Sequence, residues 1–154
     1  MLTKIDKFKD KYYFLSNYYK APVIYHGIFF TNNESAFQSA KLIGTKYEYR
    51  CREFSNLPPN LAKRKGRRVA LRPDWEQVKD KVMYDIVKCK FNMNDGLKEK
   101  LLATGNVMLI EGNNWNDTYW GYDFDKKQGL NKLGNILMQV RYELGDNYHQ
   151  NSKN

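Results

Sequence analysis

The order of hydrophobic and polar positions predicts short strands near the N-terminus and helices after them. Residues 23–30 set β-branched and aromatic side chains on both sides of His26-Gly27, which is typical of a hairpin with a tight turn. Asn32 or Asn33 comes next, and either residue can cap a helix. Spacings of three and four place four residues on one face of this helix: Glu34, Phe37, Gln38 and Lys41.

Proline and aspartate divide the middle of the chain into two further helices. Pro58-Pro59 interrupts the chain, and we expect Asn60 to cap a short basic helix that ends near Gly66. Asp74 lies three residues before Gln77, which resembles a capping box at a helix start. The apolar face of this second helix has positions three or four apart: Trp75, Val78, Val82, Ile86 and Cys89.

The C-terminal part predicts two helices around a short strand. One helix runs from about residue 95 to 103 and stops at Gly105, and residues 107–111 read as a buried strand. Residues 119–122 are expected to pair with that strand, and the last helix begins near Asn131. The sum is a mainly helical α+β fold with a few short strands, in a single domain over residues 1–154.

The numbers and spacing of cysteine and histidine indicate the cellular compartment and whether a metal site is expected. Cys51 and Cys89 lie 38 positions apart without a CxxC partner, so a reduced cytoplasmic pair is expected. His26 and His149 are too few and too scattered for a zinc site, so no metal is predicted. No apolar run of about 18 residues exists, and the N-terminus lacks the apolar core of a secretory signal. We therefore expect a cytoplasmic protein without a membrane span.

Positive charge is concentrated in one segment. The chain carries +9 in total, and residues 41–72 alone hold ten Lys or Arg against Glu48 and Glu53. A local field of this size favours phosphorylated metabolites, nucleotides or a nucleic-acid strand as partners. A solvated surface that aids solubility is the alternative.

Two distant stretches are rich in polar residues, and each holds one carboxylate beside aromatic rings and amides. Residues 33–41 contain Glu34, and residues 113–121 contain Asp117. A carboxylate, a ring and amide donors in one pocket are the groups needed to hold a sugar-linked base and break its bond. Taken alone, Glu34 is a first-turn acid favoured by the helix dipole, and Asp117 is an Asx-turn residue.

Five ordered motifs resemble one known family. They are Phe14-x-Ser16-Asn17-Tyr18, Glu34-x-x-Phe37-Gln38-x-x-Lys41, Gly66-Arg67 with Leu71-Arg72-x-x-Trp75-Glu76-x-x-Lys79, Asn116-Asp117-x-x-Trp120-Gly121, and Gly129-x-Asn131-x-Leu133-Gly134-x-x-Leu137-Met138. This pattern is similar to the NADAR (YbiA-like) family, over about residues 13–144. Members of that family include N-glycosidases that act on riboflavin-biosynthesis intermediates. The chain departs from the usual pattern at Ser35 and Ala36, where many members have a histidine and an aromatic residue.

The resemblance implies a hydrolase that needs no cofactor and cleaves a ribosyl N-glycosidic bond in phosphoribosylated pyrimidines. It assigns the catalytic work to Glu34 and Asp117, and leaves open which of them is the base. It implies a pocket role for Trp75 and Trp120, which could stack on a flat heterocycle, although each ring alone is more often part of a core. Candidates to hydrogen-bond the ribose or base are Asn17, Gln38 and Asn131, and candidates to hold a phosphate are Lys41, Arg67 and Arg72.

Two other functions compete with this interpretation. One is removal of ADP-ribose from guanine in nucleic acid, which the basic segment 41–72 and the altered neighbours of Glu34 favour. The other is a non-catalytic module that binds NAD or ADP-ribose, which needs the pocket without its acids. The catalytic interpretation requires Glu34 and Asp117 to lie on opposite walls of one cleft, with an indole ring lining it.

Overall fold

Two compact units make up the chain. The computed structural model describes the backbone of residues 1–152 and the side chains of residues 1–145, so the side chain of His149 lies outside the described residues. Unit 1 consists of Met1–Ser16 and Asp95–Asn154, and unit 2 is Asn17–Asn94. The single domain over residues 1–154 stays a prediction.

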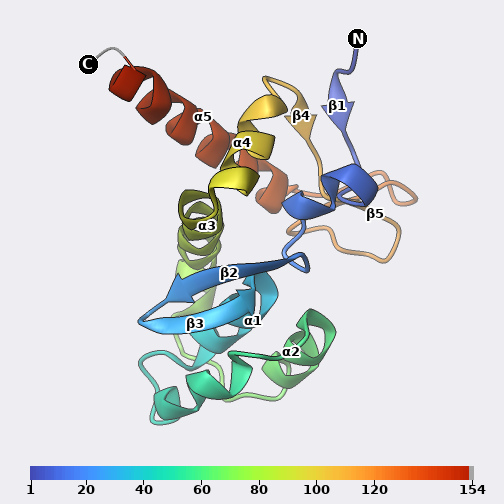
Figure 1. Cartoon of the computed structure of the whole chain (residues 1–154). Helices are drawn as coiled ribbons and strands as arrows, with labels where there is room; N and C mark the ends of the chain where they lie inside the picture. The colour runs from blue at the N-terminus through green and yellow to red at the C-terminus, as the bar shows by residue number, and fades with distance from the viewer. Residues whose placement is uncertain (153–154) are drawn as a thin grey trace. The chain divides into compact units, whose positions relative to one another are not determined.

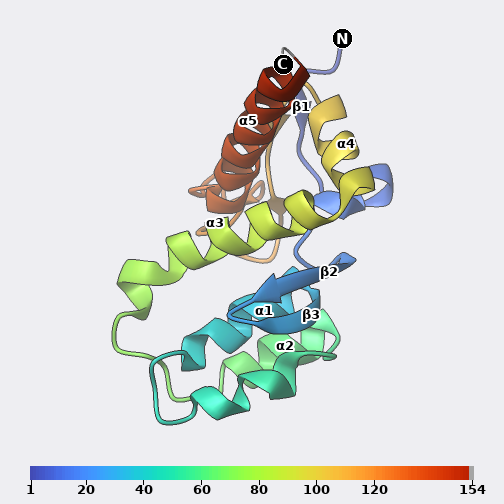
Figure 2. The ribbon, with the colours of Figure 1, turned by 60° about the vertical axis from the view of Figure 1, so that its left-hand side comes forward.

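The hairpin of unit 2 confirms the strand prediction. Strand β2 (Lys20–Tyr25) pairs antiparallel with β3 (Ile28–Asn32), and Tyr25 stands opposite Ile28. His26 and Gly27 between them have φ angles of 48° and 75°. Two consecutive positive φ angles are typical of the type I′ turn that matches the twist of a hairpin. Figures 1 and 2 show the hairpin lying against helix α1.

Helix α1 (Asn33–Ser39) is buried along its whole length. Asn32 Oδ1 accepts a hydrogen bond from the Ser35 N–H at 2.8 Å, so Asn32 is the cap and the α-helix starts at Asn33. The helix is shorter than the predicted face, because Lys41 already lies in the 3-10 turn η2 (Ala40–Leu42). Two 3-10 turns escaped prediction altogether, η1 (Asp10–Leu15) in unit 1 and η3 (Glu48–Phe54) in unit 2.

The other two helices of unit 2 form where predicted, but neither has the predicted cap. Helix α2 (Pro59–Gly66) begins at a proline, so Asn60 lies inside its first turn and is not the cap. Helix α3 (Trp75–Met93) has Asp74 at its N-cap without a side-chain capping bond. The predicted capping box is wrong, because the Asp74 carboxylate accepts hydrogen bonds from Arg72 instead.

Unit 1 combines two helices with very short parallel strand pairs. Helices α4 (Asp95–Ala103) and α5 (Lys132–Ser152) contact each other (Figures 1 and 2). Strand β1 (Lys4–Ile5) pairs with β4 (Met108–Leu109), and β5 (Gly112–Asn113) pairs with β6 (Tyr122–Asp123). The predicted pairing of residues 107–111 with 119–122 holds only at its end, where the Tyr122 N–H donates to the Glu111 carbonyl oxygen at 2.9 Å and Tyr122 stands opposite Gly112. The N-terminal strand takes the place beside β4, which sequence-local reasoning did not consider.

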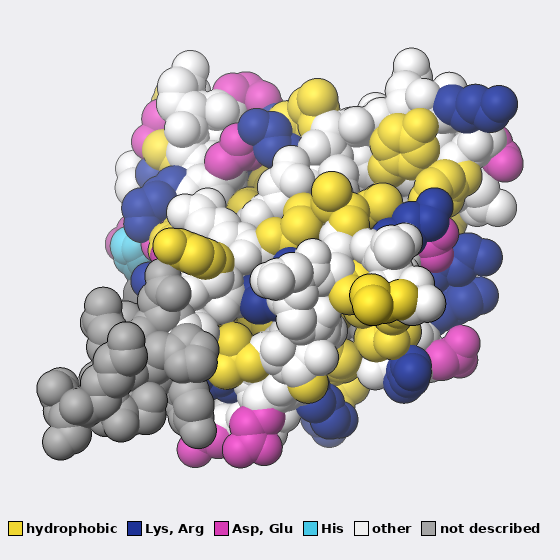
Figure 3. Space-filling view, turned by 90° about the horizontal axis from the view of Figure 1, so that it is seen from above, with side chains coloured by type: hydrophobic (Ala, Val, Ile, Leu, Met, Phe, Trp, Pro, Cys, Tyr) yellow, Lys and Arg dark blue, Asp and Glu magenta, His cyan; other side chains and the backbone are white. Residues whose placement is uncertain are grey.

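Charged side chains of both signs lie on the face of the molecule shown in Figure 3. Basic and acidic side chains are scattered there among apolar and uncharged polar ones, mostly towards the edges of the view. Within residues 1–152, no helix is long and apolar enough to cross a membrane. Across the same part of the chain, no three His, Cys, Asp or Glu side chains gather in a way that could hold a metal ion.

Both cysteines are free thiols. Cys51 is buried, and its Sγ donates to the Ser39 carbonyl oxygen at 3.3 Å. Burial raises the pKa of Cys51 to about 11, so the thiol stays protonated and unreactive near neutral pH.

Candidate active site

The Glu34 carboxylate of α1 is almost fully buried, and the side chain of Gln38, one helical turn later, hydrogen-bonds it. Gln38 Nε2 donates to Glu34 Oε1 at 2.8 Å, and the two side chains are 5% and 8% exposed respectively. The other end of the same amide, Gln38 Oε1, is buried and has no hydrogen-bond partner among the described residues. An unpaired buried acceptor is unusual in a native structure and marks a place where a donor is needed.

Gly66, the last residue of α2, determines where the Gln38 amide can lie. A Cβ added to Gly66 would lie 1.9 Å from Gln38 Oε1 and 2.6 Å from Gln38 Cδ. Only a residue without a side chain lets α2 approach the amide this closely. Gly66 therefore closes the space behind Gln38 and keeps its amide against Glu34.

Trp75 and Lys41 lie beside this pair. The Trp75 ring is 6% exposed and packs against Phe37 with the ring centroids 5.1 Å apart and a 52° tilt. Lys41 Nζ lies 5.9 Å from the centre of the Trp75 ring and 3.3 Å from the Gly66 carbonyl oxygen. The predicted residues Glu34, Gln38, Lys41 and Trp75 thus come together within unit 2, and we call this group the acid cluster.

Lys41 is the cation of the acid cluster, and its pKa is lowered from the ordinary lysine value. Burial is the largest cause, because it disfavours the charged form. The Glu34 carboxylate opposes this shift, while Arg67 and Lys63 reinforce it. The positive field of the basic segment therefore reaches the acid cluster.

The two arginines predicted to hold a phosphate differ in their surroundings. Arg72 Nε and Nη2 donate to the Asp74 carboxylate at 2.6 and 3.0 Å, and Arg72 Nη1 donates to the Ala40 carbonyl oxygen at 3.3 Å. The hydrogen bonds to Asp74 raise the pKa of Arg72, and the bonds to Asp74 and Ala40 together occupy all three of its guanidinium nitrogens. Arg67 is exposed at the end of α2. The geometry thus favours Arg67 over Arg72 as a phosphate ligand.

Asn17 supports the start of α1. Its Oδ1 accepts from Asn33 Nδ2 at 3.2 Å, and its carbonyl oxygen accepts from the Glu34 N–H at 3.2 Å. Its Nδ2 lies 3.4 Å from the sulfur of Met83 on α3. Asn17 therefore fixes the backbone that carries Glu34, and its binding of substrate stays a prediction.

Asp117 lies in unit 1, on the loop between β5 and β6. Its Oδ1 accepts from the Trp120 N–H at 3.1 Å, which is the turn geometry expected of an aspartate in an Asn-rich loop. The Asn113 side chain braces this loop, because its Nδ2 donates to the Asp117 carbonyl oxygen at 2.9 Å and its Oδ1 accepts from the Asp117 N–H at 3.1 Å.

Asp123 braces the same loop from its other end. It is 1% exposed, and its carboxylate accepts from the backbone N–H groups of Asn116, Asp125 and Lys126 at 2.8 to 3.0 Å. These hydrogen bonds, that from Lys126 first, lower the pKa of Asp123 and keep it charged. Sequence analysis missed this role, because the hydrogen bonds to Asp123 come from main-chain groups whose positions only the folded loop sets.

Trp120 and Asn131 complete the predicted residues of unit 1. The Trp120 ring meets Tyr119 edge-on, with centroids 4.8 Å apart. Asn131 has a φ of 50°, and its amide binds main chain at both ends, accepting from the Glu111 N–H at 2.9 Å and donating to the Leu109 carbonyl oxygen at 3.0 Å. Asn131 therefore connects β4 to the start of α5.

Lys90 is a buried cation that sequence analysis missed. It is 1% exposed on α3, with its Nζ 5.5 Å from the centre of the Tyr19 ring and 5.2 Å from that of Phe91. Burial lowers the pKa of Lys90 to about 7. Its position on the buried face of α3, four residues after Ile86, was the signal that could have found it.

The predicted residues fall into two groups. Unit 2 holds the acid cluster with Asn17, Arg67 and Arg72, and unit 1 holds Asp117, Trp120 and Asn131. The expectation that Glu34 and Asp117 lie on opposite walls of one cleft stays a prediction, because the two acids belong to different units.

Comparison with known proteins identifies relatives over nearly the whole chain. The N-glycosidase YbiA of Escherichia coli (strain K12) is 36% identical over 137 residues, which is 88% of this chain and 83% of that protein. The riboflavin biosynthesis protein VVA0006 of Vibrio vulnificus (strain YJ016) is 31% identical over 131 residues, 85% of this chain and 35% of that protein. The riboflavin biosynthesis protein PYRR of Arabidopsis thaliana is 46% identical over 77 residues, 49% of this chain and 12% of that protein.

The fold agrees with these relatives. The NMR structure of the E. coli protein YbiA superposes with a TM-score of 0.81 at 34% identity, covering 96% of this chain and 89% of that one. The prediction of a mainly helical fold with few short strands is confirmed. The model of the NADAR domain matches residues 5–145, which confirms the resemblance and extends it at both ends. The chain therefore belongs to the NADAR family.

Proposed function

We propose that this protein is an N-glycosidase that hydrolyses the ribosyl N-glycosidic bond of phosphoribosylated pyrimidines in riboflavin synthesis. The names of its relatives support both parts, since one is an N-glycosidase and two are riboflavin biosynthesis proteins. The observation that carries the proposal is the acid cluster. There, a buried carboxylate is held by an amide whose own oxygen lacks a donor.

Glu34 carries the chemistry in this proposal. Hydrolysis breaks the bond between the ribose C1 and the base nitrogen, and water supplies the oxygen that takes its place on C1. Positive charge builds on the ribose as the base leaves, and a carboxylate near C1 stabilises that charge or deprotonates the water. The rule for paired carboxylates at O-glycosides extends to this bond by analogy, and assigns the second position to Asp117.

The other residues of the acid cluster bind substrate in this proposal. A hydroxyl or N–H group of the substrate would donate to Gln38 Oε1 and satisfy its missing hydrogen bond. Trp75 is packed against Phe37, so it offers a rigid wall that a pyrimidine can contact. Lys41 and Arg67 would hold the phosphate of the ribosyl group, Lys41 as a point charge and Arg67 with its forked donors.

The test is direct turnover with matched variants. Purified protein is incubated with 5-amino-6-(5-phosphoribosylamino)uracil, and the free base is followed by HPLC with mass spectrometry. We expect release of the base by the wild type and its near abolition in Glu34→Gln, which keeps the side-chain shape without the charge. Glu76→Gln is the matched control, because Glu76 is an exposed acid on α3 that pairs with Lys79. Absence of turnover, or equal turnover in Glu34→Gln, contradicts the proposal.

A second candidate keeps the reaction and changes the substrate to ADP-ribosylated guanine in a nucleic-acid strand. The exposed side chains of Arg64, Arg67 and Arg68 at the end of α2 favour it, because a cluster of exposed arginines attracts phosphate backbones. Incubation with ADP-ribosylated single-stranded DNA distinguishes the two substrates. An intact adduct after incubation eliminates this candidate.

A further inference from the structure

One pocket in unit 2 shares no lining residue with the acid cluster, and residues of η3, the end of α2 and the segment after α2 line it. Its volume is about 340 Å³, and the residues that decide its chemistry are Tyr47, Arg50, Glu53, Lys65 and Arg68. None of these belongs to the acid cluster. The volume is at the lower end of the range of small-molecule sites, about 300–1,000 Å³.

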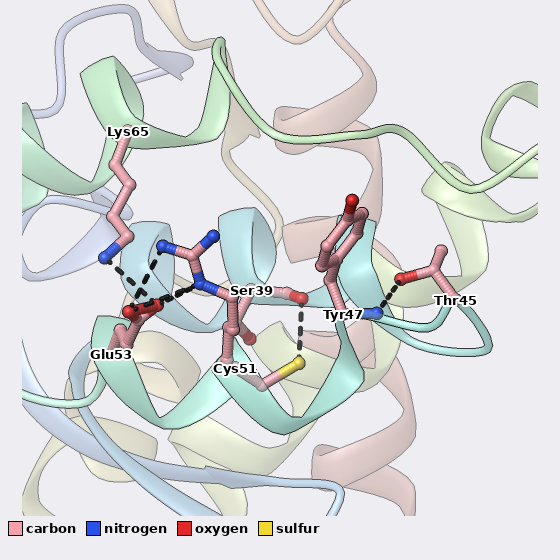
Figure 4. Close-up of polar contacts among 7 residues, drawn as sticks. Ser39, Thr45, Tyr47, Cys51, Glu53 and Lys65 are labelled. Carbon is pink, nitrogen blue, oxygen red and sulfur yellow. Dashed lines mark hydrogen bonds and ion pairs between the residues drawn. The ribbon is translucent and has the colours of Figure 1, made fainter.

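The pocket has more positive than negative side chains, and its one acid, Glu53, holds two of the cations in place. Arg50 Nε donates to Glu53 Oε2 at 2.9 Å, and Lys65 Nζ lies 3.5 Å from the same oxygen. Figure 4 shows Lys65 reaching from α2 towards Glu53 on η3. The hydrogen bond from Arg50 lowers the pKa of Glu53, so this acid stays charged. One carboxylate therefore fixes two cations but neutralises only one of them.

Arg68 provides the cation that is available to a ligand. It is exposed, and its side chain makes no hydrogen bond or ion pair with residues 1–145. With Arg68 included, three cations face one carboxylate, so the pocket has two uncompensated positive charges. Tyr47 stands at the start of η3, where its N–H donates to Thr45 Oγ1 at 3.1 Å, and its ring projects from the ribbon (Figure 4).

We propose that this pocket binds a phosphate group of a small phosphate ester. A phosphate monoester carries about −1.5 to −2 charges at neutral pH, which matches the two uncompensated cations. Its three oxygens suit the forked donors of Arg68 better than a carboxylate does, and Arg50 Nη1, which does not bond Glu53, can add one more donor. The Tyr47 ring provides a surface on which a nucleobase attached to that phosphate can stack. This proposal is independent of the reaction at Glu34, because it concerns binding alone.

The experiment is an NMR titration of ¹⁵N-labelled full-length protein with inorganic phosphate, and then with a pyrimidine nucleoside monophosphate. We expect saturable shifts in the amides of residues 47–53 and 65–70. Arg68→Gln should weaken binding about tenfold, the cost of one charged hydrogen bond. Arg64→Gln is the matched control, because Arg64 is a neighbouring exposed arginine, within α2 and outside the pocket, and the change removes the same charge. Glu53→Gln should strengthen binding, since it removes the one negative charge.

Each outcome decides the proposal. Saturable shifts that Arg68→Gln weakens and Arg64→Gln leaves unchanged support it. Equal weakening by both variants means that a general surface field attracts the anion, and overturns the pocket. The proposal is also overturned if the protein responds to neither phosphate nor nucleotide but binds a single-stranded oligonucleotide. That result would assign the surface to a nucleic-acid strand.

Discussion

Replacement of Gly66 by alanine is the sharpest perturbation of the acid cluster. The new Cβ would stand 1.9 Å from Gln38 Oε1, whereas real Cβ contacts essentially never fall below 3.0 Å. The Gln38 amide must therefore move by at least 1.1 Å, the difference between these distances. Gly66 does not have a positive φ, so its backbone accepts alanine without strain.

The cost of this movement follows from the bond that it breaks. Gln38 Nε2 donates to the buried Glu34 carboxylate at 2.8 Å, and a hydrogen bond to a charged group is worth roughly 1.5–3 kcal/mol. Alanine in place of glycine within a helix returns roughly 0.5–1 kcal/mol. We expect a net loss of about 0.5–2.5 kcal/mol in unfolding free energy. Misplacement of a reacting group by 1 Å can cost about 100-fold in rate, so kcat should fall far more than stability.

The assay compares kcat for base release with the free energy of unfolding in urea. Gly96→Ala is the control for a general effect of alanine, because Gly96 of α4 has open space around its Cα. Gln38→Ala should lose as much activity as Gly66→Ala, and the double variant should lose no more than either. The reasoning is refuted if Gly66→Ala leaves kcat unchanged. It also fails if Gly66→Ala costs as much in the Gln38→Ala background as in the wild type.

Three more predictions test separate features. Asp117→Asn keeps an oxygen that can accept the Trp120 N–H, so thermal stability should be unchanged while turnover falls roughly 100-fold or more; a parallel loss of stability would point to a structural role. Asn131→Ala leaves two main-chain groups unpaired at a positive φ, and should lower the free energy of unfolding by roughly 2–4 kcal/mol in urea. An unchanged urea midpoint would contradict that. Burial lowers the pKa of Lys90 to about 7 from 10.5, so unfolding takes up a proton between these values. The free energy of unfolding of the wild type should therefore rise between pH 7 and 10.5. Lys90→Met should be more stable than the wild type below pH 7 and should lack the part of this rise that is due to Lys90. Identical pH profiles of urea unfolding in the two proteins would refute this.

The local elements were predictable because short-range chemistry decides them. His26-Gly27 is a turn pair between β-favouring residues, and the hairpin forms there with the positive φ angles that such a turn requires. The apolar spacing of α3 and the cap at Asn32 act within a few residues, so both could be read from the chain. The family could be recognised for a different reason, since its motifs are ordered over most of the sequence.

Two predictions of helix caps were wrong because a neighbouring residue competes with the expected one. Asp74 has the sequence position of a capping residue, yet Arg72 two residues away takes its carboxylate. Asn60 has the right residue type for a cap, but Pro59 already suits the first helical position and the helix starts there. In each case the sequence is compatible with two local arrangements of the helix start, and only one of them forms in the folded backbone.

Contacts between segments far apart in the sequence could not be predicted from any local pattern. The pairing of β1 with β4 joins residues about a hundred positions apart, because two-residue strands carry too little pattern to specify a partner. The approach of Gly66 to Gln38 and the contact of Lys65 with Glu53 also depend on how α2 packs against neighbouring elements. The sequence by itself therefore determined the local elements and the family, and named most of the candidate residues. Tertiary structure decided which side chains are held, buried or left open to a ligand, because those properties depend on atoms from distant segments.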